Sequence, residues 1–218
     1  MLKADLHIHT RYSMDCSTTL EQVINECQKK DINCVAIADH GAIDGALRMK
    51  EVAPFPVIVA EEILTTRGEI MGMFLEELVP SGLSMEESIT RIKAQGGLLC
   101  IPHPFDMVRQ SALNSDTIEK IVEQIDVLEV FNARSLLLSS SNKSRTFAKK
   151  YGIPGSAGSD AHTAAEIGNV YVEMREFNGK ADFLKALSDG KVCGRKTSLF
   201  AHFNSTLERI KHNLAGNK

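Results

Sequence analysis

Short apolar runs rich in valine, isoleucine and leucine alternate along this chain with amphipathic segments. Strands that are buried on both faces read as continuous apolar runs, so this alternation is typical of parallel strands covered by helices. The pattern therefore predicts an α/β fold. Seven strands are expected, near residues 3–7, 34–38, 57–60, 70–75, 98–101, 127–131 and 155–157.

Helix start signals lie between these strands. Thr18 stands three residues before Glu21, and Ser84 stands three residues before Glu87. Each pair resembles a capping box, in which a hydroxyl and a carboxylate satisfy backbone N–H groups at the start of a helix. Two further helices are expected, over 181–188 and 207–214.

The composition is that of an ordinary globular protein, with 43% hydrophobic residues in a chain of 218. That length can bury a substantial core, and no linker rich in proline, glycine and serine divides it. We expect one domain over residues 1–218, with a helical extension after about residue 195.

Polar residues stand at or just after the ends of six predicted strands. Parallel strands closed into a barrel place their carboxyl ends around one mouth. An open α/β sheet binds ligands only at its switch points, so six of its strands converge less readily on one site. The pattern therefore favours a barrel. The residues are His7, His9, Asp39, His40, Glu62, His103, Glu129, Asn132, Asp160 and His162.

Two histidine clusters far apart in the chain carry the strongest chemical signal. His7 and His9 are separated by one residue, so both face the same side of a strand. Asp160 and His162 repeat this spacing and add a carboxylate that can bridge cations. The two pairs together predict one polynuclear metal site.

Each of these positions also has an ordinary structural interpretation. A single H-x-H pair can be two exposed histidines at a strand end. Asp39 could cap a helix, and His103, between two prolines, could be a packed loop residue. Because five of the seven histidines stand at predicted strand ends, their joint placement favours the metal site.

Six motifs occur in order within residues 1–175: D-L-H-I-H-T, A-D-H-G, A-E-E-I, I-P-H-P, E-V-F-N-A-R and G-S-D-A-H. As an ordered set they resemble the PHP superfamily, named for polymerase and histidinol phosphatase, and specifically its stand-alone metal-dependent phosphoesterases. The resemblance implies a distorted seven-stranded (β/α)7 barrel. It also implies a centre of two or three divalent metal ions, which would be Zn²⁺, Mn²⁺ or Fe²⁺.

The resemblance also implies the metal ligands. Glu62 matches a bridging carboxylate, with Glu61 as the neighbouring alternative. Asp15 resembles a ligand of a third metal, or else it caps a helix. Glu69 stands where similar proteins often have histidine, and is either a ligand that favours a harder cation such as Mn²⁺ or a solvated strand residue. The implied set is His7, His9, Asp15, His40, Glu62, His103, Asp160 and His162.

The implied reaction is hydrolysis of a phosphate ester by a hydroxide that bridges two metal ions. Arg134 is expected to grip the phosphate, Asn132 to support the site, and Arg11 to be a second phosphate contact, although each arginine could instead be a solvated surface residue. A histidine bound to metal cannot also act as a free base. Four residues are candidates for proton transfer: Asp160, His40, His103 and His162.

The expected substrate is a small phosphorylated metabolite, a nucleotide or a short oligonucleotide. Histidinol-phosphatase-like and exonuclease activities are alternatives. A formal net charge of −3 argues against binding to a long duplex. A noncatalytic metal-stabilised interaction module is an alternative of another class, which the near-complete ligand set disfavours. The sequence leaves the oligomeric state open.

The five cysteines form no C-x-x-C pair, which suits a reduced cytoplasmic setting better than a disulfide framework. The N-terminus lacks a signal-peptide pattern, because Asp5, His7 and His9 interrupt its apolar positions. No apolar stretch is long enough to span a bilayer, so no membrane partner is expected.

Overall fold

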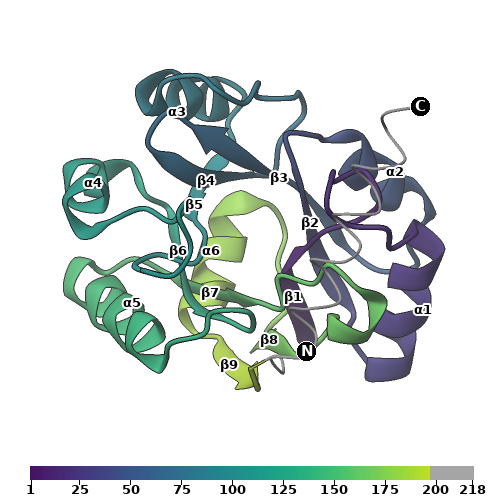
Figure 1. The fold of residues 1–218 in the computed structure, drawn as a ribbon. Coiled ribbons are helices and arrows are strands. Elements are labelled where there is room, and N and C mark those ends of the chain that lie inside the picture. Colours follow the sequence, from purple (N-terminus) through teal and green to yellow (C-terminus); the bar gives the residue numbers. More distant parts are fainter. Residues whose placement is uncertain (197–218) are drawn as a thin grey trace.

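A mixed sheet curls almost into a barrel, and most of the helices lie around its outside (Figure 1). The computed structural model describes residues 1–196. The strands in this part are β1 (Leu2–Ile8), β2 (Cys34–His40), β3 (Val57–Thr65), β4 (Gly68–Met73), β5 (Leu98–Ile101), β6 (Val127–Asn132), β7 (Gly155–Gly158), β8 (Val170–Met174) and β9 (Lys191–Gly194). The helices are α1 (Leu20–Lys30), α2 (Asp44–Val52), α3 (Met85–Ala94), α4 (Ser115–Lys120), α5 (Leu138–Tyr151) and α6 (Lys180–Ser188), with short 3₁₀ turns η1 (Val122–Gln124) and η2 (Ala164–Glu166).

The barrel closes where β1 meets the segment that follows β7. The hydrogen-bonded strand order is β7-β6-β5-β4-β3-β2-β1-β8-β9. A parallel bridge joins Ile8 to Ala161, and the Asp160 N–H donates to the His7 carbonyl at 2.8 Å. The two histidine clusters, about 150 residues apart in the chain, are therefore neighbours.

All seven predicted strands occur, but the predicted count and direction need correction. The described sheet has nine strands, because β8 and β9 follow β7. β4 runs antiparallel to both β3 and β5, and β8 runs antiparallel to β1. The turn between Thr65 and Gly68 has two residues, whereas a parallel connection needs a crossover of a dozen or more. The fold is thus a nearly closed, barrel-like mixed sheet of nine strands, and a seven-stranded (β/α)7 count is not confirmed.

The helix starts agree with the sequence to within one residue. Thr19, not Thr18, caps α1, and it forms the capping box with Gln22. The Ser84 hydroxyl caps α3 as expected, accepting from the Glu87 N–H. The helix expected over 207–214 lies outside the described residues, and so does all but the start of the extension expected after about residue 195. In residues 1–196, none of the helices has both the length and the apolar character needed to cross a membrane.

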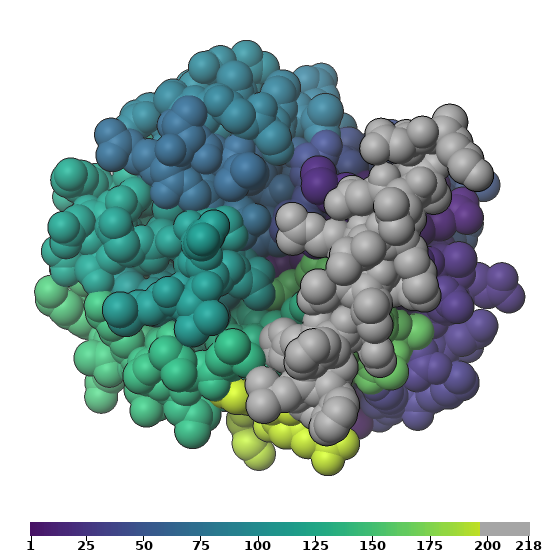
Figure 2. Space-filling model, viewed as in Figure 1, coloured from purple at the N-terminus to yellow at the C-terminus, as the bar shows by residue number. Residues whose placement is uncertain are grey.

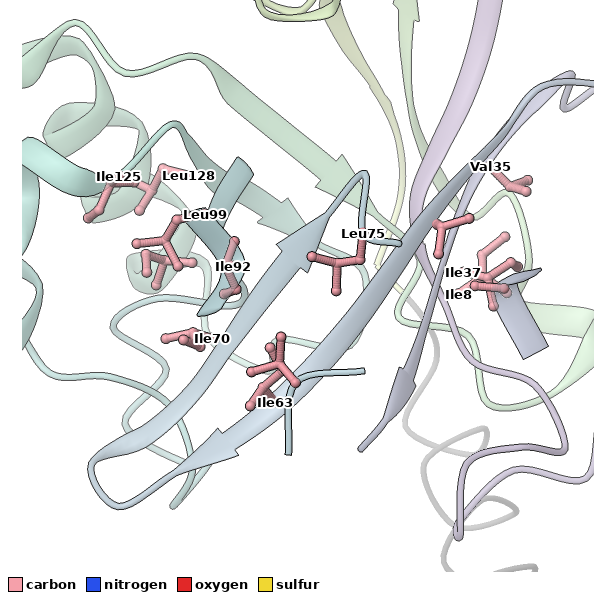
Figure 3. Packing of buried hydrophobic residues seen from close by; sticks show 14 of the residues in the cluster. Ile8, Val35, Ile37, Ile63, Ile70, Leu75, Ile92, Leu99, Ile125 and Leu128 are labelled. Atoms are coloured by element: carbon pink, nitrogen blue, oxygen red, sulfur yellow. The ribbon is translucent and has the colours of Figure 1, made fainter. Parts of the chain in front are cut away.

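The core has two apolar layers. Side chains of alternate positions on β2 point to opposite faces, so Val35 and Ile37 pack against the helices (Figure 3) while Cys34 and Ala36 fill the barrel. α6 packs through Phe183 among residues from the amino ends of the parallel strands and the carboxyl ends of the antiparallel strands β4 and β8. Apolar packing thus fills the amino-terminal end of the barrel, and polar side chains gather at the opposite mouth.

Candidate metal centre

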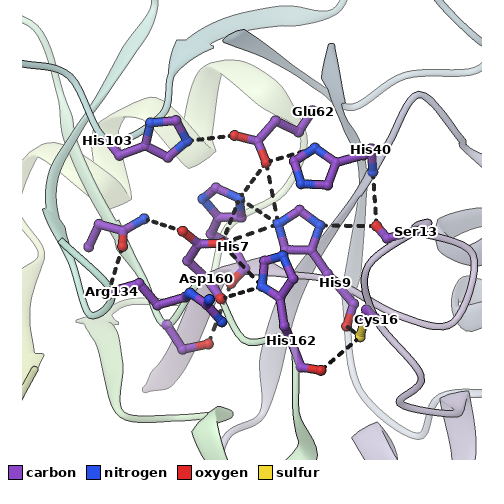
Figure 4. A network of polar contacts seen from close by, with 12 residues as sticks. His7, His9, Ser13, Cys16, His40, Glu62, His103, Arg134, Asp160 and His162 are labelled. Carbon is purple, nitrogen blue, oxygen red and sulfur yellow. Dashed lines mark hydrogen bonds and ion pairs between the residues drawn. The ribbon is translucent and has the colours of Figure 1, made fainter. Parts of the chain in front are cut away.

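All eight predicted ligands converge at the carboxyl ends of β1, β2, β3, β5 and β7, seven of them labelled in Figure 4. His7 Nε2 lies 3.1 Å from His9 Nε2, and both atoms lie 3.3 Å from Glu62 Oε2. The face that carries these strand ends is hollowed at its centre (Figure 2). We call this group the histidine–carboxylate cluster: His7, His9, Asp15, His40, Glu62, His103, Asp160 and His162.

Two of these histidines have one ring nitrogen fixed by a partner outside the cluster. His7 Nδ1 donates to Glu129 Oε1 at 3.1 Å. His9 Nδ1 lies 3.1 Å from Ser13 Oγ. The Ser13 hydroxyl donates its only proton to Asp39 Oδ1 at 3.0 Å, so it must accept a hydrogen bond from His9 Nδ1. Such partners fix the tautomer and leave Nε2 as the free lone pair.

His162 follows the same rule. Its Nδ1 lies 2.9 Å from the Asp160 carbonyl oxygen, which can only accept, so Nε2 carries the lone pair. That Nε2 faces Asp15 Oδ2 at 3.2 Å. Burial and the nearby His9 lower the pKa of His162. A neutral imidazole lone pair facing a carboxylate is repulsive unless a cation lies between them.

The cluster therefore fits divalent cations on its own chemistry. The Nε2 lone pairs of His7 and His9 face each other at hydrogen-bond distance, which only a proton or a cation reconciles. Asp15 Oδ1 and Asp160 Oδ1 are buried and have no hydrogen-bond partner within residues 1–196. Imidazole nitrogens and carboxylate oxygens are the donors that Zn²⁺, Mn²⁺ and Fe²⁺ accept.

Glu62 occupies the middle of the cluster. Its Oε1 lies 2.7 Å from His103 Nε2, and its Oε2 lies 3.4 Å from His40 Nδ1. Although burial raises the pKa of this carboxyl, the surrounding histidines bring it well below its usual range. Glu61 points the other way on the strand, where Oε2 accepts from the Val79 N–H at 2.9 Å. Glu62 therefore faces the cluster, whereas Glu61 faces away from it.

Glu69 lies at the start of β4, and the hairpin turn brings it to the same mouth. Its carboxylate is 3.5 Å from His103 Nε2 and 3.9 Å from His40 Nδ1, and it accepts from the Ser111 hydroxyl at 2.5 Å. The side chain is buried, so the alternative of a solvated strand residue is wrong. Glu62, Glu69 and His103 therefore bring two carboxylates and one imidazole close enough together to hold a metal ion.

Protons compete with cations for the same nitrogens. Burial lowers the pKa of His7 and His9, but neighbouring carboxylates more than offset it, raising the pKa of His7 well above its ordinary value and that of His9 to about 9. When no cation is bound, a proton therefore lies between the facing Nε2 atoms of His7 and His9.

Asp160 is held ionised by a residue that the sequence did not indicate. Arg109 Nη2 donates to Asp160 Oδ2 at 2.6 Å. Burial alone would raise the pKa of Asp160, but Arg109 and the histidines bring it well below its usual range. Asn132 also donates to Asp160 Oδ2, at 3.2 Å, so it lies against the cluster. Arg109 lies in the irregular loop after β5, where no periodic pattern marks it.

The other predicted phosphate contacts differ in position. Arg134 lies at the rim, where Nη1 donates to Glu166 Oε1 at 3.2 Å. Glu166 in turn accepts from the His162 N–H, so it links Arg134 to the cluster. Arg11 is exposed, and its guanidinium lies 5.8 Å from the centre of the Tyr12 ring. The described contacts thus connect Arg134 with the cluster more closely than Arg11.

Cys16 is a second contact that the sequence did not indicate. Its thiol donates to the carbonyls of His9 and His162, at 3.5 and 3.1 Å, and so ties the two histidine segments together. Burial raises its pKa to about 11, which makes it a hydrogen-bond donor and a poor nucleophile.

Comparison with known sequences identifies relatives over most of the chain. A family model described as "PHP domain" matches residues 5–73, and one described as "PHP-associated" matches residues 139–192. The uncharacterized protein MJ0417 of Methanocaldococcus jannaschii is 34% identical over 181 residues, which cover 81% of this chain and 72% of that protein. The uncharacterized protein MJ1587 of the same organism is 40% identical over 145 residues, covering 61% and 82%.

Two solved structures share the fold. One is a two-domain protein from Bacteroides vulgatus described as containing a predicted PHP-like metal-dependent phosphoesterase, with a TM-score of 0.70 and 14% identity. The match covers 89% of this chain and 65% of that one, so this chain spans just under two thirds of its length. The other is PsfC from Pseudomonas syringae, with a TM-score of 0.70, 14% identity and coverage of 96% and 98%. At this identity the likeness shows the fold alone.

Proposed function

Because this chain belongs to the PHP superfamily, we propose that it is a metal-dependent phosphoesterase whose histidine–carboxylate cluster holds divalent metal ions. One observation carries the proposal: the Nδ1 partners of His7, His9 and His162 hold these rings so that their Nε2 atoms face one another and the cluster's carboxylates. Divalent cations at such a centre lower the pKa of bound water and neutralise the oxygens of a phosphate ester.

The ligands divide into groups because one ring nitrogen binds one ion. His9 Nε2 stands within reach of two groups, one with His7 and Glu62 and the other with His40 and His162. If His9 serves the first, the second is completed by Asp15, whose Oδ2 lies 3.6 Å from His40 Nε2. The proposed groups are His7, His9, Glu62 and Asp160; Glu62, Glu69 and His103; and Asp15, His40 and His162.

The same contacts sort the candidates for proton transfer. Asp160 is kept ionised by Arg109, so it accepts a proton or orients a nucleophile and does not serve as the acid. His40 has a side chain that is 19% exposed, whereas those of His103 and His162 are 0% and 6% exposed. Exposure favours His40 for proton exchange with solvent, but only if His40 is not a metal ligand, because a metal-bound histidine cannot also act as a free base.

The substrate is proposed to be a small phosphorylated metabolite, a nucleotide or a short oligonucleotide, with histidinol-phosphatase-like or exonuclease activity as narrower versions. Arg109 and Arg134 supply positive charge on the side of Asp160, and Asn132 orients that carboxylate. A net charge of −3 disfavours a long duplex, and it fits a small substrate held by a few local contacts in a cytoplasmic protein.

The test is hydrolysis by metal-reconstituted protein across a panel of phosphomonoesters and phosphodiesters. The variants His7→Ala and Asp160→Ala are expected to lose bound metal, measured by elemental analysis, together with hydrolysis. Glu51→Ala, at an exposed helix position, is the matched control and should keep both. Full metal occupancy without hydrolysis of any ester would instead favour the noncatalytic metal-stabilised module.

A further inference from the structure

A cavity of about 600 Å³ opens beside the metal centre, between the loop that follows β5 and the start of α5. Small-molecule sites in proteins are usually cavities of roughly 300 to 1,000 Å³ with mostly apolar walls and a few polar groups. This cavity has that character. Its walls include Phe105, Met107, Arg109, Leu113, Leu137 and Lys143.

Two residues connect the cavity with the metal centre. Arg109 lines the cavity, and its guanidinium donates to Asp160 at 2.6 Å. Ser140 lines it too, and also lines the narrow crevice beside His103 and Asn132. A phosphate ester whose phosphate lies against the cluster would therefore direct its organic group towards this cavity.

The rim of the cavity exposes apolar side chains to water. Met107 is 91% exposed and Leu137 is 43% exposed, and neighbouring Val108 and Leu138 are also exposed. Apolar side chains grouped in this way mark surfaces that a ligand or partner covers. At the far side Lys143 donates to Ser115 Oγ at 2.6 Å and lies 4.6 Å from the centre of the Phe105 ring, which fixes that wall.

We infer that this cavity binds the esterified group of the substrate, and that this group is an uncharged, largely apolar body of ring size or larger. The inference rests on the proposed phosphoesterase function. The apolar walls favour phosphate esters of aromatic or other apolar alcohols over esters of small polar alcohols such as glycerol. The positive charge of Arg109 lies at the end of the cavity nearest the cluster, where the phosphate belongs.

The test compares Leu137→Asp with Leu78→Asp, a matched loop leucine that is 47% exposed and lies outside the cavity. The Michaelis constant for 2-naphthyl phosphate should rise about tenfold or more in Leu137→Asp, because one apolar contact is replaced by a charge. That for methyl phosphate should stay within about twofold, because its group does not reach the wall. Leu78→Asp should change neither.

Binding of 2-naphthol, followed by its fluorescence, gives a second measurement that needs no hydrolysis. Wild type should bind 2-naphthol, and Leu137→Asp should bind it about tenfold more weakly. Equal binding of 2-naphthol by both proteins would overturn the inference. So would a dimer that forms with rising protein concentration, covers the cavity and excludes 2-naphthol from it. Binding that depends on Leu137 without hydrolysis of any ester would instead contradict the phosphoesterase proposal and leave the cavity as a binding site.

Discussion

The Ser13 hydroxyl holds two histidines of the cluster, so Ser13→Ala is the sharpest test of how the site is organised. The oxygen accepts from His9 Nδ1 at 3.1 Å and from the His40 N–H at 2.9 Å, while its proton goes to Asp39 at 3.0 Å. Asp39 retains two bonds from Thr10, at 2.6 and 2.8 Å, so the carboxylate stays satisfied in the variant. In the variant, His9 Nδ1 loses the partner that fixes its tautomer and the orientation of its ring.

The expected magnitude follows from the role of such partners. Removing a residue that orients a metal-bound histidine typically lowers metal affinity or activity by about 10- to 100-fold. A tenfold change corresponds to about 1.4 kcal/mol, so the loss of binding free energy should be about 1.4 to 2.8 kcal/mol. The partly buried His40 N–H also loses its acceptor, which should lower the free energy of unfolding by about 1 kcal/mol.

The assay is competition between the protein and a chelating dye for Mn²⁺ or Zn²⁺. Ser88→Ala is the control, since Ser88 is equally buried and its hydroxyl donates to the carbonyl of Ser84, the N-cap residue of α3, at 3.0 Å. Thermal unfolding of the cation-free proteins separates a loss of folding from a loss of affinity. If Ser13→Ala binds metal as tightly as wild type and Ser88→Ala, the tautomer argument is refuted.

Three further variants test separate contacts. Arg109→Met should raise the pKa of Asp160 towards its ordinary range, so the acid limb of the pH–rate profile should move to higher pH; an unmoved limb would contradict that role. Glu69→Gln should weaken Mn²⁺ binding about tenfold or more while Zn²⁺ binding changes less, as followed by Mn²⁺ electron paramagnetic resonance. Burial raises the pKa of Glu61 to about 7 from 4.5, so the folded state binds more protons than the unfolded state between those values and stability should fall as pH rises through that window. Glu61→Gln should reduce this fall and leave the part due to His7 and His9, when urea unfolding at pH 5 and pH 8 is compared in the presence of a chelator.

The sequence indicated the cluster well because barrel closure does the positioning. Once His7 and His162 stand at the ends of strands that become neighbours, their convergence follows from the fold, and local spacing is enough to find them. The direction of β4 was not predictable from its apolar residues, since strand periodicity is the same in both directions. The two-residue turn before Gly68 was the available signal. The sequence also contained a signal for the strand β8, which was not predicted: apolar and polar positions alternate in V-Y-V-E-M, residues 170–174.

The residues that support the cluster were harder to predict. Ser13 and Arg109 lie in irregular loops, and their roles depend on contacts to residues far away in the sequence, among them Asp39 and Asp160, which lie 26 and 51 positions away. No periodicity distinguishes such a serine or arginine from a solvated one. Only the folded arrangement identifies the hydroxyl that fixes His9 and the guanidinium that holds Asp160 ionised.

Anomalous diffraction at the metal absorption edges, from crystals of metal-reconstituted protein, tests the central claim most directly. The account predicts peaks within about 2.0 to 2.3 Å of the Nε2 atoms of His7 and His9, with Glu62 bridging to a second peak beside His103. Well-occupied metal found only elsewhere on the protein, with no peak beside Glu62, would contradict the account.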